Sequence, residues 1–528
     1  MALTSVKTAA PGKARLNYPK TILTGFGFLG TTVAWTIYDP YITKILDRLL
    51  SASPVVAAWS ERLAGSSLLE RFIASQGESA FAAGRFTLVP LFIGIIMTFD
   101  NIFGVVFQPL FGKLSDGCHS RWGKRRPFIF FGAPISALLF VLIPLMSTLP
   151  ALMVTIILFV FVMSLWRAPV VALMPDLTPP ELRSEGNAVI NLMGGVGGAL
   201  AMAAGTVVTV IHLAITGMTK ESPGYDEFST FPAVFAVGAA LMLVGMLVLL
   251  FFVKEKDSRL LSADLLAARD DAARKAAEKE ARLAEKAERK SLKLSKAERG
   301  SLFAMLGGLF FLFCSVNAVT TFFSLFAQEI LHKDTAQATL LMMVLTAGSM
   351  LAAIPAGLLG KKIGRKKTIV LGFVCFLGAF AVFFGVFLAL CASQDLGVSS
   401  YVSLNSADPG HPAILKILST LDILILPVIF IAGVSNMLIT VNTLPLVLEI
   451  GGLKKVGTFT GYYYTATFSA QVASPIAYGF FRMFSGTYLS LFYYAPVALL
   501  ISLILILFVR HGEAIPQEVI REAEEAAG

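Results

Sequence analysis

The sequence predicts an all-α integral membrane protein with twelve transmembrane helices in two pseudo-symmetric six-helix bundles. Its 528 residues are 56% hydrophobic and only 15% charged, against roughly 25% charged residues in a soluble domain. Its apolar runs repeatedly reach the roughly 20 residues that a helix needs to cross a bilayer. A charge-rich stretch in the middle of the chain divides these runs into six and six. These observations favour an integral membrane protein over every soluble class.

Twelve apolar runs have the length of a membrane-spanning helix. They occupy residues 21–46, 88–112, 127–148, 151–174, 187–213, 231–253, 302–330, 335–358, 368–391, 421–448, 457–480 and 487–509. We therefore expect five parts: a tail (1–20), a six-helix bundle (21–253), a charged linker (254–300), a second six-helix bundle (301–510) and a tail (511–528). The first tail is polar and basic, without the apolar core of a removable signal peptide.

The net charge of +9 follows the expected membrane topology. Most of the 43 Lys and Arg residues fall in the two tails, the central linker and alternate loops between the spans. This positive-inside pattern places both termini in the cytoplasm of a multi-pass protein of the plasma or inner membrane, and it argues against a nucleic-acid partner. The four cysteines and five histidines have no metal-ligand or disulfide spacing, so we expect no metal, no cofactor and no enzyme.

Two segments outside the spans are unusual. The linker is rich in Ala, Lys, Arg and Glu, and pairs such as Glu278 and Arg282 have helical i,i+4 spacing. We expect a solvated cytoplasmic helix there; contact with lipid headgroups or a partner is the alternative. Segment 49–85, which contains Trp59, is long for an outer loop. It is either an amphipathic cover on the outside or a simple loop.

The two halves repeat a pattern of glycine and basic residues after their second spans. GKLSD (112–116) and GKRR (123–126) in the first half correspond to GLLGK (357–361) and GRKK (364–367) in the second. An acidic residue follows the fourth span of each half, first Asp176 and then Glu449.

This repeat predicts a cytoplasmic gate. We expect Gly112 to permit a close helix approach, Asp116 to pair with a basic residue, and the basic cluster to latch the two bundles together. The alternative is that the charges only fix the topology. The candidate gate residues are Gly112, Asp116, Arg121, Lys124, Arg125, Arg126, Asp176, Arg183 and Arg365.

The stretch from Gln108 to Ile129 carries a family resemblance. The residues Gln108-Pro109, Gly112, Ser115-Asp116, Cys118, Ser120-Arg121, Gly123 and Arg125-Arg126-Pro127-Phe128-Ile129 closely resemble the second-helix signature of sucrose/proton symporters. These symporters belong to the glycoside–pentoside–hexuronide branch of the major facilitator superfamily. The segments Asp39-Pro40-Tyr41, 172–177, Asn187, 441–445 and 457–463 also resemble members of this branch. The resemblance implies two repeated halves and alternating-access transport of a disaccharide or other glycoside with protons.

Three charged side chains within the spans of the first bundle are candidates for coupling, because charge at membrane depth usually marks the route of a transported species. A helical rise of 1.5 Å per residue places Asp39 about 28 Å, Asp100 about 24 Å and Arg167 about 13 Å from the cytoplasmic ends of their helices. We expect these three residues to couple transport to a cation, although the difference in height argues against a direct pair between Arg167 and Asp100. The alternatives are that Asp39-Pro40 begins an extracellular exit and that Asp100-Asn101 caps a kink.

The coupling ion that we favour is H⁺ rather than Na⁺. Asp100, Gly104 and Gln108 share one helix face, and in the melibiose carrier, a relative that can use sodium, the positions matching Gly104 and Gln108 carry carboxylates. A bare cation needs several hard oxygen ligands, so one carboxylate cannot build the same site, but it can carry a proton because burial favours its neutral form. Plant-type sucrose carriers have an acidic residue inside the fourth span, which residues 151–175 lack. We therefore expect the proton at Asp39 or Asp100.

Sugars are bound by hydrogen bonds and by aromatic rings against their CH faces. The residues of this chemistry within the spans are Trp35, Tyr38, Asn101, Gln108, Asn187, Asn191, Asn317, Asn442, Tyr462, Tyr463 and Gln471. For each Asn or Gln the alternative role is to hold helices together.

The function that we expect is proton-coupled symport of a sugar of the sucrose or maltose type, by a monomer in the lipid bilayer. One alternative is an antiporter or exporter of another small molecule, since a fold does not settle a function. The other is a non-transporting membrane sensor with the charged linker as its output element.

Overall fold

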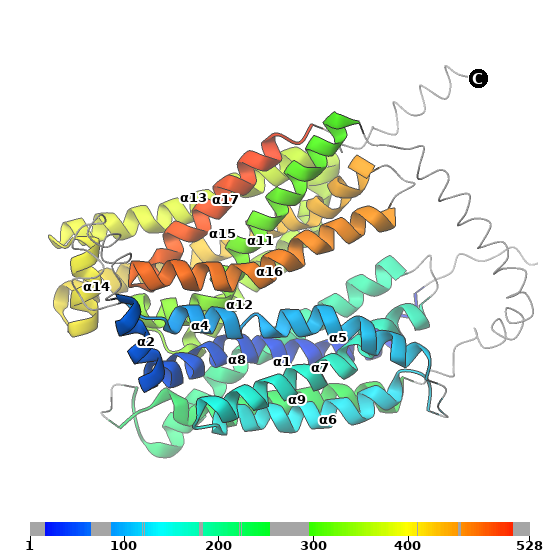
Figure 1. Cartoon of the computed structure of the whole chain (residues 1–528), viewed down its shortest axis with the longest axis horizontal. Coiled ribbons are helices and arrows are strands. Elements are labelled where there is room, and N and C mark those ends of the chain that lie inside the picture. The colour runs from blue at the N-terminus through cyan, green and yellow to red at the C-terminus, as the bar shows by residue number, and fades with distance from the viewer. Residues whose placement is uncertain are drawn as a thin grey trace, which may run out of the picture.

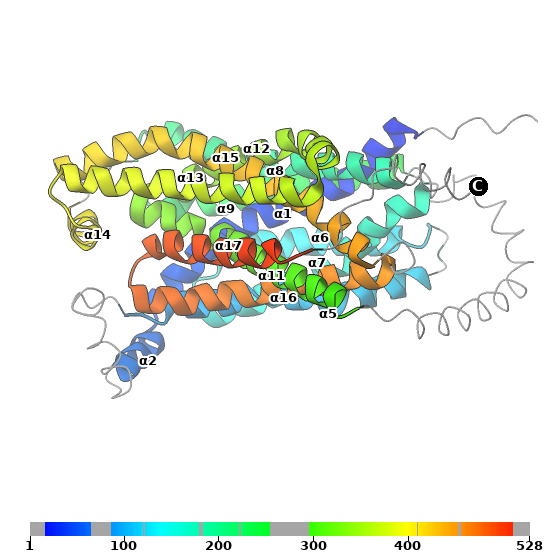
Figure 2. The same ribbon diagram turned by 90° about the horizontal axis from the view of Figure 1, so that it is seen from above.

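The structure is a computed structural model, and it describes residues 16–64, 86–118, 120, 122–178, 183–220, 222, 224–253, 295–408, 410–451 and 456–510. Most of the two tails, the linker residues 254–294 and the candidate gate residue Arg121 lie outside the described residues. The long helices run side by side in one block (Figure 1), and a view turned by 90° shows the same block from above (Figure 2).

The first half of the chain supplies six long helical segments that match the first six expected spans. They are α1 (Tyr18–Ser51), α4 (Val89–Ile96) with α5 (Phe99–Asp116), α6 (Arg126–Leu142), α7 (Leu149–Leu177), α8 (Arg183–Thr216) and α9 (Phe231–Phe252). Shorter elements join them, namely α2 (Pro54–Ala64) and the 3-10 turns η1 (Ile143–Leu145) and η3 (Glu227–Thr230). We call this group the N half.

The second half matches the remaining six expected spans. Its long helices are α11 (Lys296–Leu331), α12 (Thr335–Ile363), α13 (Arg365–Ser393), α15 (Pro412–Gly451), α16 (Val456–Ser485) and α17 (Leu491–Leu507). The short elements are α14 (Val398–Ala407) and η6 (Tyr488–Ser490). We call this group the C half. The largest difference from the expected boundaries is at α15, which begins nine residues before the expected 421.

Ten of the described helices, with α4 and α5 counted as one, are long and apolar enough to cross a membrane. The other two expected spans are α1 and α16, which are equally long but richer in Gly, Thr and Tyr. Both lie where the halves meet: α1 packs against α11, and α16 packs against α4. Their lower hydropathy is therefore explained by their position between the halves, where less of their surface faces lipid.

The two ends of the block differ in charge. The end that carries Lys113, Arg125, Arg126, Arg365 and Lys366 is here called the basic end, and the other is called the far end. The short helices α2 and α14 lie at the far end in both views (Figure 1, Figure 2).

Local sequence signals explain where the helices of the C half begin. Ser295 and Glu298 form a reciprocal capping box at the start of α11. Asp334 and Gln337 form another at the start of α12, with Gln337 N–H donating to Asp334 Oδ1 at 2.8 Å. Between them His332, at φ 52°, ends α11 in a left-handed conformation. The turn from α11 to α12 is therefore set by capping chemistry.

The two aspartates expected within the spans lie in different helical settings. The second span is interrupted at Met97 and Thr98, and Asp100 lies in the first turn of α5, whose N-cap residue is Thr98 and has no side-chain cap. In contrast, α1 passes through Pro40 and continues to Ser51. The alternative that Asp39-Pro40 ends the first span is therefore wrong, because the proline is tolerated inside a long helix.

The hydrophobic core is shared between the halves at one end only. One cluster joins the N half to the part of the C half at the far end, and it includes Phe140, Phe235, Phe322, Phe326 and Tyr478. A separate cluster fills the C half at the basic end, and it includes Met305, Ile369, Leu446, Tyr463 and Ile506. The halves are thus packed into one body at the far end, whereas at the basic end the C half has a core of its own.

Glycines bring the backbones of the two halves together toward the far end. A Cβ atom at Gly94 of α4 would lie 2.1 Å from the carbonyl oxygen of Pro475 in α16, and one at Gly479 would lie 2.3 Å from that of Pro90. No side chain fits at either position. The contact between α4 and α16 is therefore a direct backbone seam.

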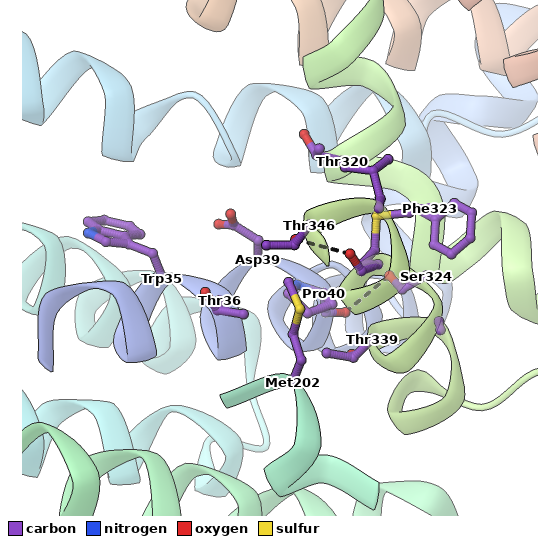
Figure 3. A pocket seen from close by; sticks show the side chains of 13 residues that line it. Trp35, Thr36, Asp39, Pro40, Met202, Thr320, Phe323, Ser324, Thr339 and Thr346 are labelled. Carbon is purple, nitrogen blue, oxygen red and sulfur yellow. Dashed lines mark hydrogen bonds between the residues drawn. The ribbon is translucent and has the colours of Figure 1, made fainter. Parts of the chain in front are cut away.

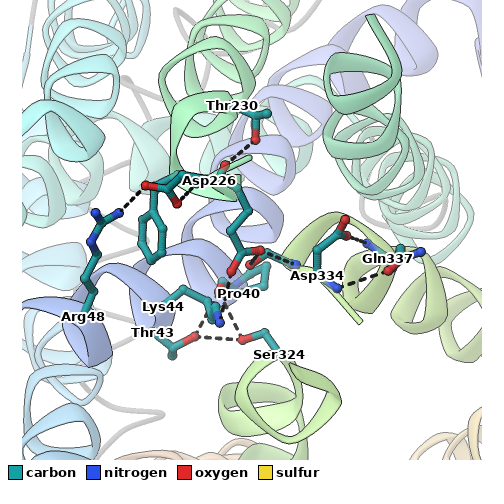
Figure 4. A network of polar contacts seen from close by, with 12 residues as sticks. Pro40, Thr43, Lys44, Arg48, Asp226, Thr230, Ser324, Asp334 and Gln337 are labelled. Atoms are coloured by element: carbon teal, nitrogen blue, oxygen red, sulfur yellow. Dashed lines mark hydrogen bonds and ion pairs between the residues drawn. The ribbon is translucent and has the colours of Figure 1, made fainter. Parts of the chain in front are cut away.

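Polar contacts close the far end beside this seam (Figure 4). Thr43 Oγ1 of α1 lies 3.0 Å from Ser324 Oγ of α11, and Ser324 Oγ donates to the carbonyl of Pro40 at 3.1 Å. Glu227 accepts from the backbone N–H of Thr335 at 3.0 Å and pairs with Lys44 at 3.2 Å. Lys220 also pairs with Asp334 across the two halves. The far end is thus sealed by hydrogen bonds as well as by apolar packing.

We expect Gly94→Ala to separate the halves at the far end, because the added methyl group meets backbone that cannot move aside. Overpacking of this kind costs about 1–3 kcal/mol. Double electron–electron resonance between labels at the exposed residues Val55 and Leu415 should report a longer distance. Gly378→Ala is the matched control, since a Cβ there meets nothing within 4 Å. Equal distances in the two variants would contradict this account of the seam.

Candidate functional site

A cavity of about 190 Å³ lies between the two halves, just below the polar seal. Its walls come from α1 and α8 of the N half and from α11 and α12 of the C half (Figure 3). The polar side chains that line it are Thr36, Asp39, Thr320, Ser324, Thr339 and Thr346, and the apolar ones include Trp35, Met202, Phe323 and Met342. Asp39 is the one ionisable group among the lining residues. The cavity therefore offers a carboxylate, several hydroxyls and an indole ring to a ligand.

The structure brings together the three charged residues expected to couple transport. Arg167 of α7 interacts electrostatically with both Asp39 and Asp100, although no direct ion pair joins any two of these three side chains. The guanidinium carbon of Arg167 lies 5.7 Å from the ring centroid of Trp35, which also lines the cavity. Asp100 Oδ1 accepts from the backbone N–H of Asn101 at 2.7 Å and from its side-chain amide at 3.1 Å. Two carboxylates and one guanidinium thus form a cluster within the N half, and Asp39 is the member that reaches the cavity wall.

The two aromatic residues expected in the first span have different environments. Trp35 is half-buried on the cavity wall, and its buried indole N–H has no hydrogen-bond partner among the described residues. Tyr38 is only 1% exposed, stacks on Phe159 with 5.6 Å between the ring centroids, and meets Trp35 edge-on. Trp35 is available to a ligand, whereas Tyr38 packs in the core of the N half.

Two of the expected sugar-binding amides donate to backbone carbonyls. Asn442 of α15 is 3% exposed, and its amide donates to the carbonyl of Ala356 in α12 at 3.1 Å. A Cβ at Gly360 would lie 1.9 Å from Asn442 Oδ1, so the amide fills the space that this glycine leaves. Asn317 donates to the carbonyl of Phe313 in its own helix at 2.8 Å. The structure therefore favours the packing alternative for Asn442, whereas this bond of Asn317 joins no second helix.

The remaining expected sugar-binding residues do not line this cavity. Asn101 is bound to Asp100 as described, and Gln108 lies one turn from Gly104 on α5. Asn191 is exposed on α8, Gln471 is half-buried on α16, Tyr462 is 45% exposed, and Tyr463 packs in the C-half core. The side chain of Asn187 lies outside the described ones.

The charged residues at the basic end form brackets within each half. Arg125 is 5% exposed; its Nε donates to Asp176 at 2.9 Å and its Nη1 to the carbonyl of Gly112 at 3.2 Å. The same guanidinium pairs with Asp116 and contacts Ser115. Arg125 therefore joins the ends of α5, α6 and α7.

The C half repeats this bracket with one ion pair. Arg365, after its second long helix, pairs with Glu449, near the end of its fourth. In the N half Arg126 additionally donates to the carbonyl of Leu250 in α9. The repeat recognised in the sequence thus joins, in each half, the loop after the second helix to the end of the fourth.

Two parts of the expected gate differ from the structure. A Cβ at Gly112 would meet nothing within 4 Å, so the expected close helix approach at this residue is wrong here. The basic cluster after the second span was also expected to latch the two halves together. In the structure the described partners of Arg125, Arg126 and Arg365 lie within their own halves. The reason is that the two halves share a hydrophobic core at the far end, whereas at the basic end the C half has a core of its own. Lys124 is exposed, and the side chain of Arg183 is outside the described ones.

The hydroxyls of the cavity wall were missed in the sequence. Thr320 and Ser324 are four residues apart on α11, and Thr339 and Thr346 are seven apart on α12. Both spacings place the side chains on one helix face, which is the available signal. The predicted site contained charged, amide and aromatic side chains and none of these hydroxyls.

The fold and the site together define a class of protein. Two similar halves of long helices, with a carboxylate at a cavity between them, are typical of a multi-pass membrane transporter. A family model described as the Major Facilitator Superfamily matches residues 21–475 and, in a second match, residues 305–527. The chain belongs to this superfamily, which confirms the resemblance found in the sequence.

Individual relatives are similar over different lengths. The sucrose transport protein SUC3 of Arabidopsis thaliana is 29% identical over 136 residues, which make up 22% of this chain and 23% of that protein. The match thus spans less than a quarter of that relative. Among solved structures, a D-xylose–proton symporter has a TM-score of 0.54 at 16% identity, covering 94% of this chain and 98% of that one. A bacterial homologue of the human lysosomal transporter Spinster, inward-facing and occupied, has a TM-score of 0.53 at 10% identity, covering 94% and 95%. At these identities the likeness shows the fold alone.

Arg125→Ala should lower the stability of the protein, because a buried guanidinium with several partners is lost. The partners Asp116 and Asp176 are 64% and 41% exposed and can be rehydrated, so we expect a loss of about 1–3 kcal/mol rather than more. Thermal unfolding of the purified protein in detergent measures the change. Lys113→Ala, which removes an exposed basic residue from the same end, should leave the midpoint unchanged. A similar midpoint for both variants would argue against the bracket.

Proposed function

We propose that this protein is a proton-coupled sugar symporter that works by alternating access. The observation that carries the proposal is the cluster of Asp39, Asp100 and Arg167 against the cavity between the halves. Charged groups at membrane depth are costly and occur where they serve the passage of ions or substrate. One member of the cluster, Asp39, reaches the cavity itself.

The charge balance of the cluster supports a proton as the coupling ion. With both carboxylates ionised, the cluster carries one negative charge more than Arg167 compensates. An uncompensated charge is unfavourable in a low-dielectric site, and uptake of one proton removes it.

The lining of the cavity supports a sugar as the substrate. Hydroxyls of Thr36, Thr320 and Thr346 and the Asp39 carboxylate can exchange hydrogen bonds with sugar hydroxyls, and Trp35 offers an aromatic face. The named relatives include a sucrose transport protein and a D-xylose–proton symporter. We propose a disaccharide or other glycoside, without assigning the sugar.

The distribution of basic residues supports the orientation. With the basic end in the cytoplasm, as the positive-inside rule requires, both termini are cytoplasmic and the protein lies in the plasma or inner membrane. The sealed far end then faces outward, and the structure represents an inward-facing conformation. We propose that the transporting unit is the monomer, since each chain contains both halves of the site.

Uptake by proteoliposomes tests the proposed function. The purified protein is reconstituted and offered a panel of labelled sugars, with and without an imposed inward proton gradient. We expect accumulation of at least one glycoside that depends on the gradient and is abolished by a protonophore. Absence of flux for every sugar would overturn the proposal, and accumulation driven by an outward gradient would indicate the antiporter.

Asp100→Asn should uncouple the sugar from the proton. The amide cannot accept the proton that neutralises the cluster, so uphill accumulation should fall to a concentration ratio of about 1 while sugar-for-sugar exchange continues. Asp408→Asn, which removes an exposed carboxylate near the start of α15, is the control and should behave as wild type. Normal uphill uptake by Asp100→Asn would remove Asp100 from the coupling role.

Arg167→Ala should weaken sugar binding and leave two carboxylates without their cation. Arg167 does not line the cavity but interacts with Asp39 and Trp35, which do, so we expect roughly a 10-fold lower affinity, or about 1.4 kcal/mol. Equilibrium binding of the labelled sugar measures this loss of affinity. Arg167→Lys keeps the charge but not the planar fork, and it should recover only part of the affinity. An unchanged affinity in Arg167→Ala would limit this residue to a structural role.

A further inference from the structure

A second, polar pocket of about 550 Å³ opens at the far end, on the other side of the seal from the central cavity. Its walls combine the end of α1 and one face of the following α2 with Glu329 of α11 and Arg482 of α16, so it lies where the halves meet. Leu50 in its wall is eleven residues after Asp39, or about 17 Å further along α1.

The helix α2 forms the outer wall of this pocket. Ser60 Oγ accepts from the backbone N–H of Leu88 at 3.1 Å, and Trp59 packs against Phe92 with 6.0 Å between the ring centroids. These contacts hold α2 against the start of α4. Of the long outer segment 49–85, the described part up to residue 64 therefore provides a cover, which leaves Glu61 facing the pocket.

Arg482 lines the pocket and carries hydrogen-bond donors that no described residue uses. Its side chain is 7% exposed, and its guanidinium carbon lies 4.2 Å from the ring centroid of Tyr488. Nη2 donates to Glu329 Oε2 at 3.3 Å, whereas Nε and Nη1 are buried and have no partner among the described residues. Buried donors without a partner cost roughly 1–3 kcal/mol each, so this arginine is poised for an acceptor that the chain does not supply.

The other charges of the pocket define what kind of acceptor fits. Glu61 and Glu329 line the pocket, and Asp47 interacts electrostatically with Arg482 from α1. Three carboxylates repel an anion, and the unused groups of Arg482 are donors, which a cation cannot satisfy. A neutral molecule with several hydroxyls accepts from Arg482 and donates to the carboxylates at the same time.

We propose that this pocket is an outer sugar site, which holds the substrate while the far end is sealed. The inference rests on the proposed function, because it takes the transported sugar as the occupant. The contacts of Thr43 with Ser324 and of Ser324 with Pro40 lie between the two sites. A sugar bound beneath α2 is thus positioned to pass inward when the halves separate at this end, and the site raises the local substrate concentration there.

Equilibrium binding to the full-length protein in nanodiscs tests the outer site. Labelled sucrose and maltose are the probes, and Asp39→Asn with Arg167→Ala disables the central site. We expect this double variant to retain a weaker binding component. Addition of Arg482→Gln should reduce that component at least tenfold, whereas addition of Arg48→Gln, an exposed arginine paired with Asp226 at the same end, should leave it unchanged.

The outcomes separate the two proposals. If wild type transports sugar but the double variant binds none, or if Arg482→Gln leaves the residual binding unchanged, the outer site is wrong and the proposed function stands. If wild type neither binds nor transports any sugar, both are wrong. Should Arg482→Gln fail to fold, Glu61→Gln on the surface helix α2 takes its place, with the same expected loss of residual binding and the same overturning result.

Discussion

The cost of placing charge in a hydrocarbon environment is the constraint on which this structure depends. Arg167 is held between Asp39 and Asp100, and none of the three faces outward as a lone charge. At the basic end the guanidinium of Arg125 is surrounded by carboxylates and a carbonyl oxygen. In each place the compensation involves several groups from different helices. The charged side chains therefore fix which helices of a half stay together, and they also mark the region between the halves where polar groups are useful.

The distribution of apolar packing complements these charges. Each half is built as a unit, through Trp166 and Ser136 in the N half and through Asn442 with Gly360 in the C half. The halves share a core only at the far end, where Gly94 and Gly479 allow the backbones to touch. A contact of this kind has few flexible side chains to rearrange. The two halves can therefore separate and meet again at this contact while the interior of each half keeps its own packing.

Sequence reasoning identified the features that depend on composition and spacing, and it missed those that depend on three-dimensional partners. The twelve spans follow from the lengths of apolar runs, and Asp39, Asp100 and Arg167 stood out because charge is rare in such runs. Nothing in the sequence showed that Asn442 reaches Ala356, or that Tyr38 turns into the core, because these are contacts between distant segments. Gly112 was expected to pack closely from its context, yet its role is to present a carbonyl oxygen to Arg125. The cavity hydroxyls do have a spacing that places them on one face of each helix, which is a signal present in the sequence.

The interruption of the second span at Met97 and Thr98 divides one transmembrane segment between two surroundings. Its first part, α4, is fastened to α16 of the other half, while its second part, α5, packs mainly on α7 of its own half. A continuous helix transmits a tilt along its whole length, whereas an interrupted helix can bend at the interruption. Bending at this point would let the tip that carries Asp116 move while the backbone contact at Gly94 stays closed, so the two ends of the molecule need not change in a single concerted step.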